Sequence, residues 1–151
     1  MLFVQQRAMH YVVGLLRVVA ILASGLIAGV TQAAFIVNTN GTVTDTATGL
    51  VWDRCALGSR TSATVPCLSN VEATYDWPTA LAQVSARNSA NHLGFNDWRM
   101  PNKNELESLV KLDVGDPAID TIAFPNTPAD NYFWTSSPAH DSFGSRAWAV
   151  D

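Results

Sequence analysis

The sequence predicts an α+β domain in which two helices pack on small antiparallel sheets that are joined by long loops. Short runs of β-branched and aromatic residues, bounded by Asn, Gly, Ser and Thr, occur near the start and the end of the domain. Between them lie two stretches with apolar residues at helical spacing, each preceded by a residue that can cap a helix. The chain has 151 residues, which is enough for one ordinary domain.

The first 33 residues differ in composition from the rest, because they contain two Arg, no acidic residue and an apolar run over 18–30. A basic N-terminal region, a central apolar region and small residues before the cleavage site are typical of a secretory signal peptide. We therefore expect a signal peptide over 1–33 and a domain over 34–151 that is exported to the periplasm, the outer surface or the medium. The alternative is an uncleaved signal anchor over 11–30, which would contact the membrane and place Arg17 in the bilayer.

The exported part is acidic, because residues 34–151 contain seven Lys and Arg against thirteen Asp and Glu, a formal net charge of −6. A general nucleic-acid binder needs a basic face that neutralises phosphates. The composition therefore excludes nucleic acid as a partner, and it conflicts with binding of anionic polysaccharides as well.

The two cysteines, Cys55 and Cys67, both lie in the exported part. An oxidising compartment favours a disulfide between them, which would close a loop of 13 residues. The alternative is a metal or redox pair. Zinc sites usually have four ligands at close spacing, but the only other candidates here are His92 and His140, and no Cys-x-x-Cys motif occurs. We expect the disulfide.

The domain begins with a predicted hairpin over 35–45. Its centre is Asn40-Gly41, and both residues tolerate the positive φ of a type I′ turn. A second turn over 46–49 leads into Leu50-Val51-Trp52, an apolar run that is typical of a buried strand.

The first helix is predicted over 77–90, with Asp76 as its cap and a proline in its first turn. The second begins with a capping-box pair, Asn102 and Glu105, and is expected to end near 113–115. Polar groups at such a loop-to-helix junction need partners, so we expect Arg99 to pair with Asp97 or Glu105 rather than to bind a ligand.

Residues 116–130 contain three prolines and no helical period, so they are predicted to form an ordered loop. The last two strands are predicted over 132–135 and 146–150, with a Ser-, Gly- and His-containing loop between them.

Five motifs in this order carry a family resemblance. They are Thr48-Gly49-Leu50-Val51-Trp52, Asp97-Trp98-Arg99-Met100-Pro101-Asn102 with Glu105-Leu106, Ile119-Asp120 with Phe124-Pro125, Tyr132-Phe133-Trp134-Thr135-Ser136-Ser137, and Ala147-Trp148-Ala149-Val150. The chain resembles the Lcl C-terminal domain family, named for a bacterial collagen-like adhesin. The resemblance implies a C-type-lectin-like fold at or beyond the cell envelope and a role in adhesion or glycan binding. Family members usually continue with a Gly turn and a final strand, so we expect the domain to lack its last strand.

The resemblance carries over no catalytic residue, and we expect a non-catalytic binding or adhesion module whose partner is a glycan or a surface protein. The candidate ligand-binding residues lie in and around the last loop: Asp130, Asn131, His140, Asp141 and Arg146. The alternative is a structural or assembly component of the envelope that pairs with a partner chain.

Four of the five Trp fall in the family motifs: Trp52, Trp98, Trp134 and Trp148. Exposed Trp rings stack on sugars, but these four lie in apolar runs or beside a helix start. At such positions Trp usually fills the core and donates its indole N–H to a carbonyl, so we expect structural roles.

Two other chemistries are weaker. Ser136 and Ser137 lie near His140 and Asp141 in the sequence, but no nucleophile elbow is present. Formylglycine-generating oxidases have a related fold and depend on reactive cysteines, which a disulfide between Cys55 and Cys67 would exclude. We therefore expect no enzyme. The acidic residues Asp113, Asp116, Asp120 and Asp130 offer oxygen ligands for calcium but do not follow the EF-hand spacing. We expect no cofactor, and a bound calcium ion is the alternative that the sequence leaves open.

Overall fold

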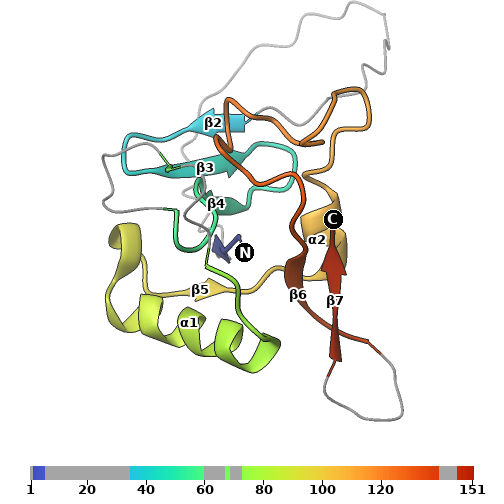
Figure 1. Ribbon diagram of the computed structural model, residues 1–151. Coiled ribbons are helices and arrows are strands. Elements are labelled where there is room, and N and C mark those ends of the chain that lie inside the picture. Colours follow the sequence, from blue (N-terminus) through green and yellow to red (C-terminus); the bar gives the residue numbers. More distant parts are fainter. Residues whose placement is uncertain (1, 6–34, 60–66, 69–72, 140–145) are drawn as a thin grey trace, which may run out of the picture.

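The computed structural model describes residues 2–5, 35–59, 67–68, 73–139 and 146–151. It confirms an α+β architecture with two α-helices and two small antiparallel sheets connected by long loops (Figure 1). Most of the predicted signal segment lies outside the described residues. Its positions 2–5 are the exception, and they run through the interior of the domain.

The larger sheet has five antiparallel strands in the order β2-β3-β4-β1-β5. The strands are β1 (Val4–Gln5), β2 (Phe35–Val37), β3 (Thr42–Asp45), β4 (Val51–Asp53) and β5 (Trp98–Arg99). Val4 lies opposite Trp52 on β4 and opposite Arg99 on β5. The start of the chain is therefore an interior strand of this sheet (Figure 1).

The predicted hairpin of β2 and β3 is confirmed, but the type I′ turn expected at Asn40-Gly41 is wrong. Val37 pairs with Val43, and the Gly41 N–H donates to the Asn38 carbonyl at 3.2 Å. In this turn only Gly41 has a positive φ, at 84°, whereas a type I′ turn needs two such residues. The Asn38 side-chain amide stabilises the longer turn by donating to hydroxyl oxygens of β3.

The helical elements are α1 (Trp77–Ser89), the single 3-10 turn η1 (His92–Gly94) and α2 (Lys103–Glu107). α1 begins as predicted, because the Asp76 carboxylate accepts a first-turn N–H at 2.9 Å. The Asn88 side chain joins α1 to β5 through both the N–H and the carbonyl of Trp98, at 2.7 and 2.8 Å. Among the residues whose placement is described, no helix is both long and apolar enough to cross a membrane.

The capping box of α2 is confirmed, with reciprocal bonds between Asn102 and Glu105. The helix ends at Glu107, however, and not near the predicted 113–115. After Ser108 the turn tightens, because the N–H groups of Leu109 and Val110 donate to the carbonyls only three residues before them, both at 3.1 Å. The Lys111 N–H then donates at 2.8 Å to the Ala118 carbonyl on the following loop, so the helix does not resume.

The second sheet pairs β6 (Phe133–Ala139) with β7 (Arg146–Val150), as predicted, although β6 is longer than expected. The register places Phe133 opposite Val150 and Ala139 opposite Arg146. Before β6, residues 116–130 contain no helix or strand, which confirms the predicted ordered loop.

The segment 2–5, which contains β1, contributes to both clusters of the hydrophobic core. Leu2 and Val4 belong to the larger cluster, and Phe3 belongs to the smaller one. The larger cluster also contains Val43, Trp52, Ala56, Leu106, Leu109, Ala123, Phe124 and Phe133, and the smaller contains Leu57 and Trp98. The predicted core positions of Trp52 and Trp98 are confirmed, with 0% and 2% exposure.

The other two motif tryptophans differ from each other. Trp134 is partly buried and donates its indole N–H to the Tyr75 carbonyl at 2.8 Å. The core position predicted for Trp148 is wrong, because this residue is 50% exposed. Side chains alternate along a strand, and the neighbouring Ala147 takes the inward position. The Lys103 ammonium lies 5.6 Å from the centroid of the Trp148 ring.

Candidate functional site

A cleft of about 510 Å³ opens between α2, the loop that follows it and the segment before β6. We call it the Tyr132 cleft. It is lined by Leu106, Leu109, Val110, Asp116, Pro117, Ala118, Ile119, Thr127, Pro128, Ala129, Asp130, Tyr132 and Phe133, with Leu2, Val150 and Asp151. Its volume lies within the range of roughly 300 to 1,000 Å³ that is usual for small-molecule sites.

The interior of the cleft is apolar. Leu106 and Leu109 project from α2 and the turn after it, and they are 4% and 2% exposed. Phe133 adds an aromatic ring at the start of β6, and Ile119 packs against the same core cluster. A ligand in the cleft would therefore meet hydrocarbon on one side.

One wall is held in place by the pair of Arg99 and Glu105. The guanidinium donates to both carboxylate oxygens, at 2.7 and 2.8 Å, and the Asn102 N–H donates to the same group at 2.8 Å. These bonds, chiefly those from Arg99, lower the pKa of the Glu105 carboxyl, although burial opposes them. The predicted pairing of Arg99 with Glu105 is confirmed, whereas Asp97 accepts from the Gln5 amide instead.

The second wall is the loop after α2, which Lys111 attaches to the helix end. Its N–H donates to the Ala118 carbonyl at 2.8 Å, and its ammonium donates to the Asp120 carboxylate at 3.0 Å. The same carboxylate accepts the N–H groups of Ile122 and Ala123, both at 3.0 Å. The Ala123 N–H is the main cause of a lowered pKa of Asp120, which Lys111 lowers further.

These two carboxyls predict how stability depends on pH. The ordinary pKa is 4.5 for Glu105 and 3.8 for Asp120, and the folded-state pKa of each carboxyl lies below it. The contribution of each carboxylate to stability is therefore complete above its ordinary pKa and is lost as pH falls through the lowered pKa. We expect a thermal midpoint, followed by circular dichroism, that falls below pH 4.5. Glu105→Gln should flatten this fall. A fall that is as steep in Glu105→Gln as in the unchanged chain would contradict the assignment.

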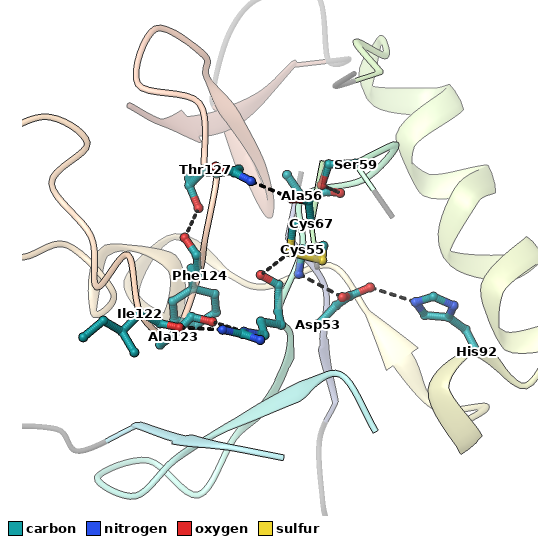
Figure 2. The surroundings of a disulfide bond; sticks show 12 residues. Asp53, Cys55, Ala56, Ser59, Cys67, His92, Ile122, Ala123, Phe124 and Thr127 are labelled. Carbon is teal, nitrogen blue, oxygen red and sulfur yellow. Dashed lines mark hydrogen bonds and ion pairs between the residues drawn. A yellow bond between two sulfur atoms is a disulfide. The ribbon is translucent and has the colours of Figure 1, made fainter. Parts of the chain in front are cut away.

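The third wall, which leads into β6, is attached to the predicted disulfide, which the structure confirms (Figure 2). Cys67 follows the loop that starts at Cys55, and its carbonyl accepts the Asn126 side-chain amide at 2.6 Å. The Thr127 hydroxyl then donates to the Phe124 carbonyl at 2.9 Å. The disulfide therefore fixes the turn that carries the first residues of this wall.

A cation beside the disulfide supports the same turn. Arg54 donates to the carbonyls of Ile122 and Ala123, at 2.8 and 3.1 Å, which are backbone groups of the turn before the third wall (Figure 2). The residue after β4 is thus joined to the turn before the third wall by hydrogen bonds from its side chain to backbone carbonyls. These bonds fix the shape of a turn that contains no helix or strand.

Polar groups and one aromatic ring form the rim of the cleft. Asp116 and Asp130 are exposed and place carboxylates there, and Thr127 adds a hydroxyl. Tyr132 is 74% exposed, which is unusual for an aromatic residue next to an apolar interior. This combination suits a ligand with an apolar face and hydroxyl or amine groups at its edge.

The structure brings together only part of the predicted ligand-binding set. Asp130 lines the Tyr132 cleft, whereas Asn131 lines an adjoining pocket of about 70 Å³ that shares Tyr132 and Phe133 with the cleft. Arg146 lies on β7 at the end of the hairpin that is distant from Asp130, and only its backbone is described. His140 and Asp141 lie outside the described residues.

Two rim residues were missed as ligand-binding candidates. Asp116 was considered only as a calcium ligand, and Tyr132 was assigned to a strand that in fact begins at Phe133. The short run of polar residues before Tyr132 is the one sequence signal that could have indicated its exposure.

The acidic residues considered for calcium serve different purposes. Asp120 binds Lys111 and backbone N–H groups, Asp116 and Asp130 lie on the rim of the cleft, and Asp113 is exposed. Within the described ranges, no group of three His, Cys, Asp or Glu side chains is arranged to hold a metal ion.

A second polar cluster lies away from the cleft, between β4 and α1. The Asp53 side chain is 2% exposed, and its Oδ2 lies 2.7 Å from His92 Nε2 (Figure 2). The same oxygen lies 3.5 Å from Arg87 Nη1. Its other oxygen accepts the Cys55 N–H at 3.0 Å. The cluster joins β4, α1 and η1, so its role is structural.

Comparison with known proteins identifies the domain. No curated protein and no solved structure matches the chain. The family model described as the Lcl C-terminal domain matches residues 41–151, which include α1, α2 and all three walls of the Tyr132 cleft. Because this match covers well over half of the sequence, the chain belongs to the Lcl C-terminal domain family.

Proposed function

We propose that this chain is a non-catalytic binding module of the bacterial cell exterior that holds a neutral glycan in the Tyr132 cleft. The observation that carries the proposal is the Tyr132 ring, which is 74% exposed at the rim of an apolar cleft that also presents two carboxylates. Membership of the family supports export and a C-type-lectin-like form of the α+β fold, as the sequence motifs imply.

The chemistry of a sugar matches this rim. A pyranose ring has an apolar C–H face and hydroxyl groups around its edge, and an exposed Tyr offers a flat apolar surface with a polar tip. Asp116 and Asp130 can accept hydrogen bonds from hydroxyls, and bonds to an ionised acceptor are roughly twice as strong as neutral ones. The ligand would thus be oriented by two kinds of contact.

The charge of the site narrows the ligand class. The exported part carries a net charge of −6, and the two rim carboxylates add negative potential at the cleft itself. Sulfated or uronate-rich polysaccharides would be repelled. Neutral glycans are therefore the class that the site favours.

Two hydroxyl side chains of β6 bond to backbone groups. The Thr135 hydroxyl donates to the Trp148 carbonyl at 2.8 Å, and the Ser137 hydroxyl accepts the Lys103 N–H at 3.0 Å. We therefore assign these two hydroxyls a structural role in the binding module.

The proposal is tested on an array of neutral glucosyl, galactosyl, mannosyl and N-acetylglucosaminyl oligosaccharides, with heparin as the anionic probe. We expect the chain to bind neutral glycans and not heparin at physiological salt. Tyr132→Ala should lower the affinity about tenfold or more, because an aromatic anchor at a binding site typically contributes this much. Asp130→Asn should lower it less, because the amide oxygen still accepts a hydrogen bond.

Trp148→Ala is the matched variant, because Trp148 is also an exposed aromatic residue but does not line the cleft. It should leave glycan binding unchanged. Loss of binding in Trp148→Ala with retention in Tyr132→Ala would overturn the location of the site. Retention on heparin alone, or no glycan binding by the folded chain, would overturn the ligand class.

A further inference from the structure

The interior strand β1 comes from the segment that the sequence marks for export. Residues 1–33 have the composition of a signal peptide, yet Leu2, Phe3 and Val4 are 2%, 0% and 0% exposed in the folded domain. β1 pairs antiparallel with both β4 and β5, and the Phe3 carbonyl accepts the Asp53 N–H at 3.0 Å. Removal of the export segment would therefore remove an interior strand.

The slot that residues 2–5 occupy between β4 and β5 requires particular side chains. Leu2 and Val4 face the larger core cluster and Phe3 faces the smaller one, so three consecutive apolar side chains are required. The Arg87 guanidinium lies 5.0 Å from the centroid of the Phe3 ring, on the side of the smaller cluster. An empty slot would expose both clusters and two rows of unpaired backbone groups, which readily accept another strand.

The fourth position of the slot fits Gln5 poorly. Its side-chain nitrogen donates to both Asp97 carboxylate oxygens, at 2.9 and 3.2 Å, but its side-chain oxygen is buried and accepts no hydrogen bond from any described residue. Asp97 is an exposed residue at the edge of the slot and forms no ion pair with the described part of the chain, and the neighbouring Arg99 binds Glu105. A side chain with donors only, Arg or Lys, would satisfy Asp97 and leave no buried acceptor without a donor.

We propose that the slot between β4 and β5 is a strand-acceptor site. Leu2–Gln5 occupy it in the full chain, and once the export segment is gone it binds an extended segment of a partner polypeptide. The partner segment runs antiparallel to both neighbours and presents three consecutive apolar residues followed by Arg or Lys. Strand addition of this kind takes its affinity from main-chain bonds and its specificity from side-chain pockets. The proposal does not rest on glycan binding, although the slot adjoins the Tyr132 cleft: Leu2 and three residues of the larger core cluster, Leu106, Leu109 and Phe133, also line the cleft.

The test uses the full chain with a cleavage site for a specific protease inserted between residues 6 and 34. After folding and cutting, fluorescent peptides Met-Leu-Phe-Val-Gln-Gln, Met-Leu-Phe-Val-Arg-Gln and Met-Leu-Asp-Val-Arg-Gln are added and followed by anisotropy. We expect the Arg peptide to bind about five- to tenfold more tightly than the Gln peptide, and the Asp peptide not to bind. The uncut chain should bind far less, because its own β1 competes at high effective concentration.

Failure of all three peptides to bind a cut chain that stays folded would overturn the proposal. So would an uncut chain that is a dimer by light scattering and exchanges β1 between copies, since the occupant is then a second copy.

A measurement on the uncut chain keeps the inference testable if cutting causes unfolding. Gln5→Arg should raise the thermal midpoint by about 3 °C, and Gln5→Glu should lower it, because a second carboxylate would face Asp97. Gln83→Arg makes the same change of charge on α1 and should have little effect. Equal midpoints for Gln5→Arg and Gln5→Glu would overturn the preference for a cation.

Discussion

Phe3→Ala is expected to lower the free energy of unfolding of the full chain by about 3 to 5 kcal/mol, the usual result of truncating a buried aromatic side chain. Phe3 is 0% exposed and packs with Leu57 and Trp98. The substitution would remove its ring from the smaller core cluster and from its contact with Arg87. Urea unfolding followed by Trp fluorescence measures the change, because Trp98 lies in the same cluster.

Ile36→Ala on β2 is the control for this prediction. Ile36 is also a large apolar strand residue, but it is 54% exposed, so we expect an effect well below that of Phe3→Ala. If Phe3→Ala were as stable as the unchanged chain, β1 would not be part of the fold, and the strand-acceptor proposal would fail with it.

Asp53→Ala is expected to cost about 3 kcal/mol, near the lower end of the range for removing one partner of a buried ion pair. The lower end applies because the Arg87 and His92 side chains keep 17% and 18% exposure. The variant removes the carboxylate that lies against the Arg87 guanidinium and the His92 ring and that accepts the Cys55 N–H. Urea unfolding at pH 7 gives the change.

A double-mutant cycle of Asp53→Asn with His92→Gln tests the cause. Contacting groups in one network usually show a coupling energy of about 0.5 to 3 kcal/mol, and we expect a value in this range. Asp113→Ala, at an exposed carboxyl, should change stability by less than about 0.5 kcal/mol. A coupling energy near zero would show that Asp53 and His92 stabilise the fold independently.

The features that local sequence determines were predicted well. The start of each helix followed from capping residues, Asp76 for α1 and the pair of Asn102 and Glu105 for α2. The disulfide followed from the even number of cysteines and the expected compartment. Such signals act over a few residues, so they can be recognised without knowledge of the rest of the fold.

The errors occurred where distant contacts decide the outcome. α2 ends at Glu107 and does not resume, because Lys111 bonds to Ala118 on the following loop. Trp148 faces outward because Ala147 takes the inward position. The signal peptide over 1–33 stays a prediction, but the local sequence does not indicate that its residues 2–5 lie in the core, because periodicity cannot distinguish a short apolar run from a strand buried on both faces. The exposure of Tyr132 depends on how three loops meet, and the short polar run before it is the one local signal of that exposure.

Amide chemical-shift mapping of the full chain tests the central claim most directly. The strongest neutral glycan from the array is added to labelled protein, and the perturbed amides are assigned. If the Tyr132 cleft is the binding site, the largest shifts will fall on Leu109, Ile119 and Tyr132, and Tyr132→Ala will abolish them. Shifts that cluster instead around Trp148 or the disulfide loop, and persist in Tyr132→Ala, would contradict a binding site in the cleft.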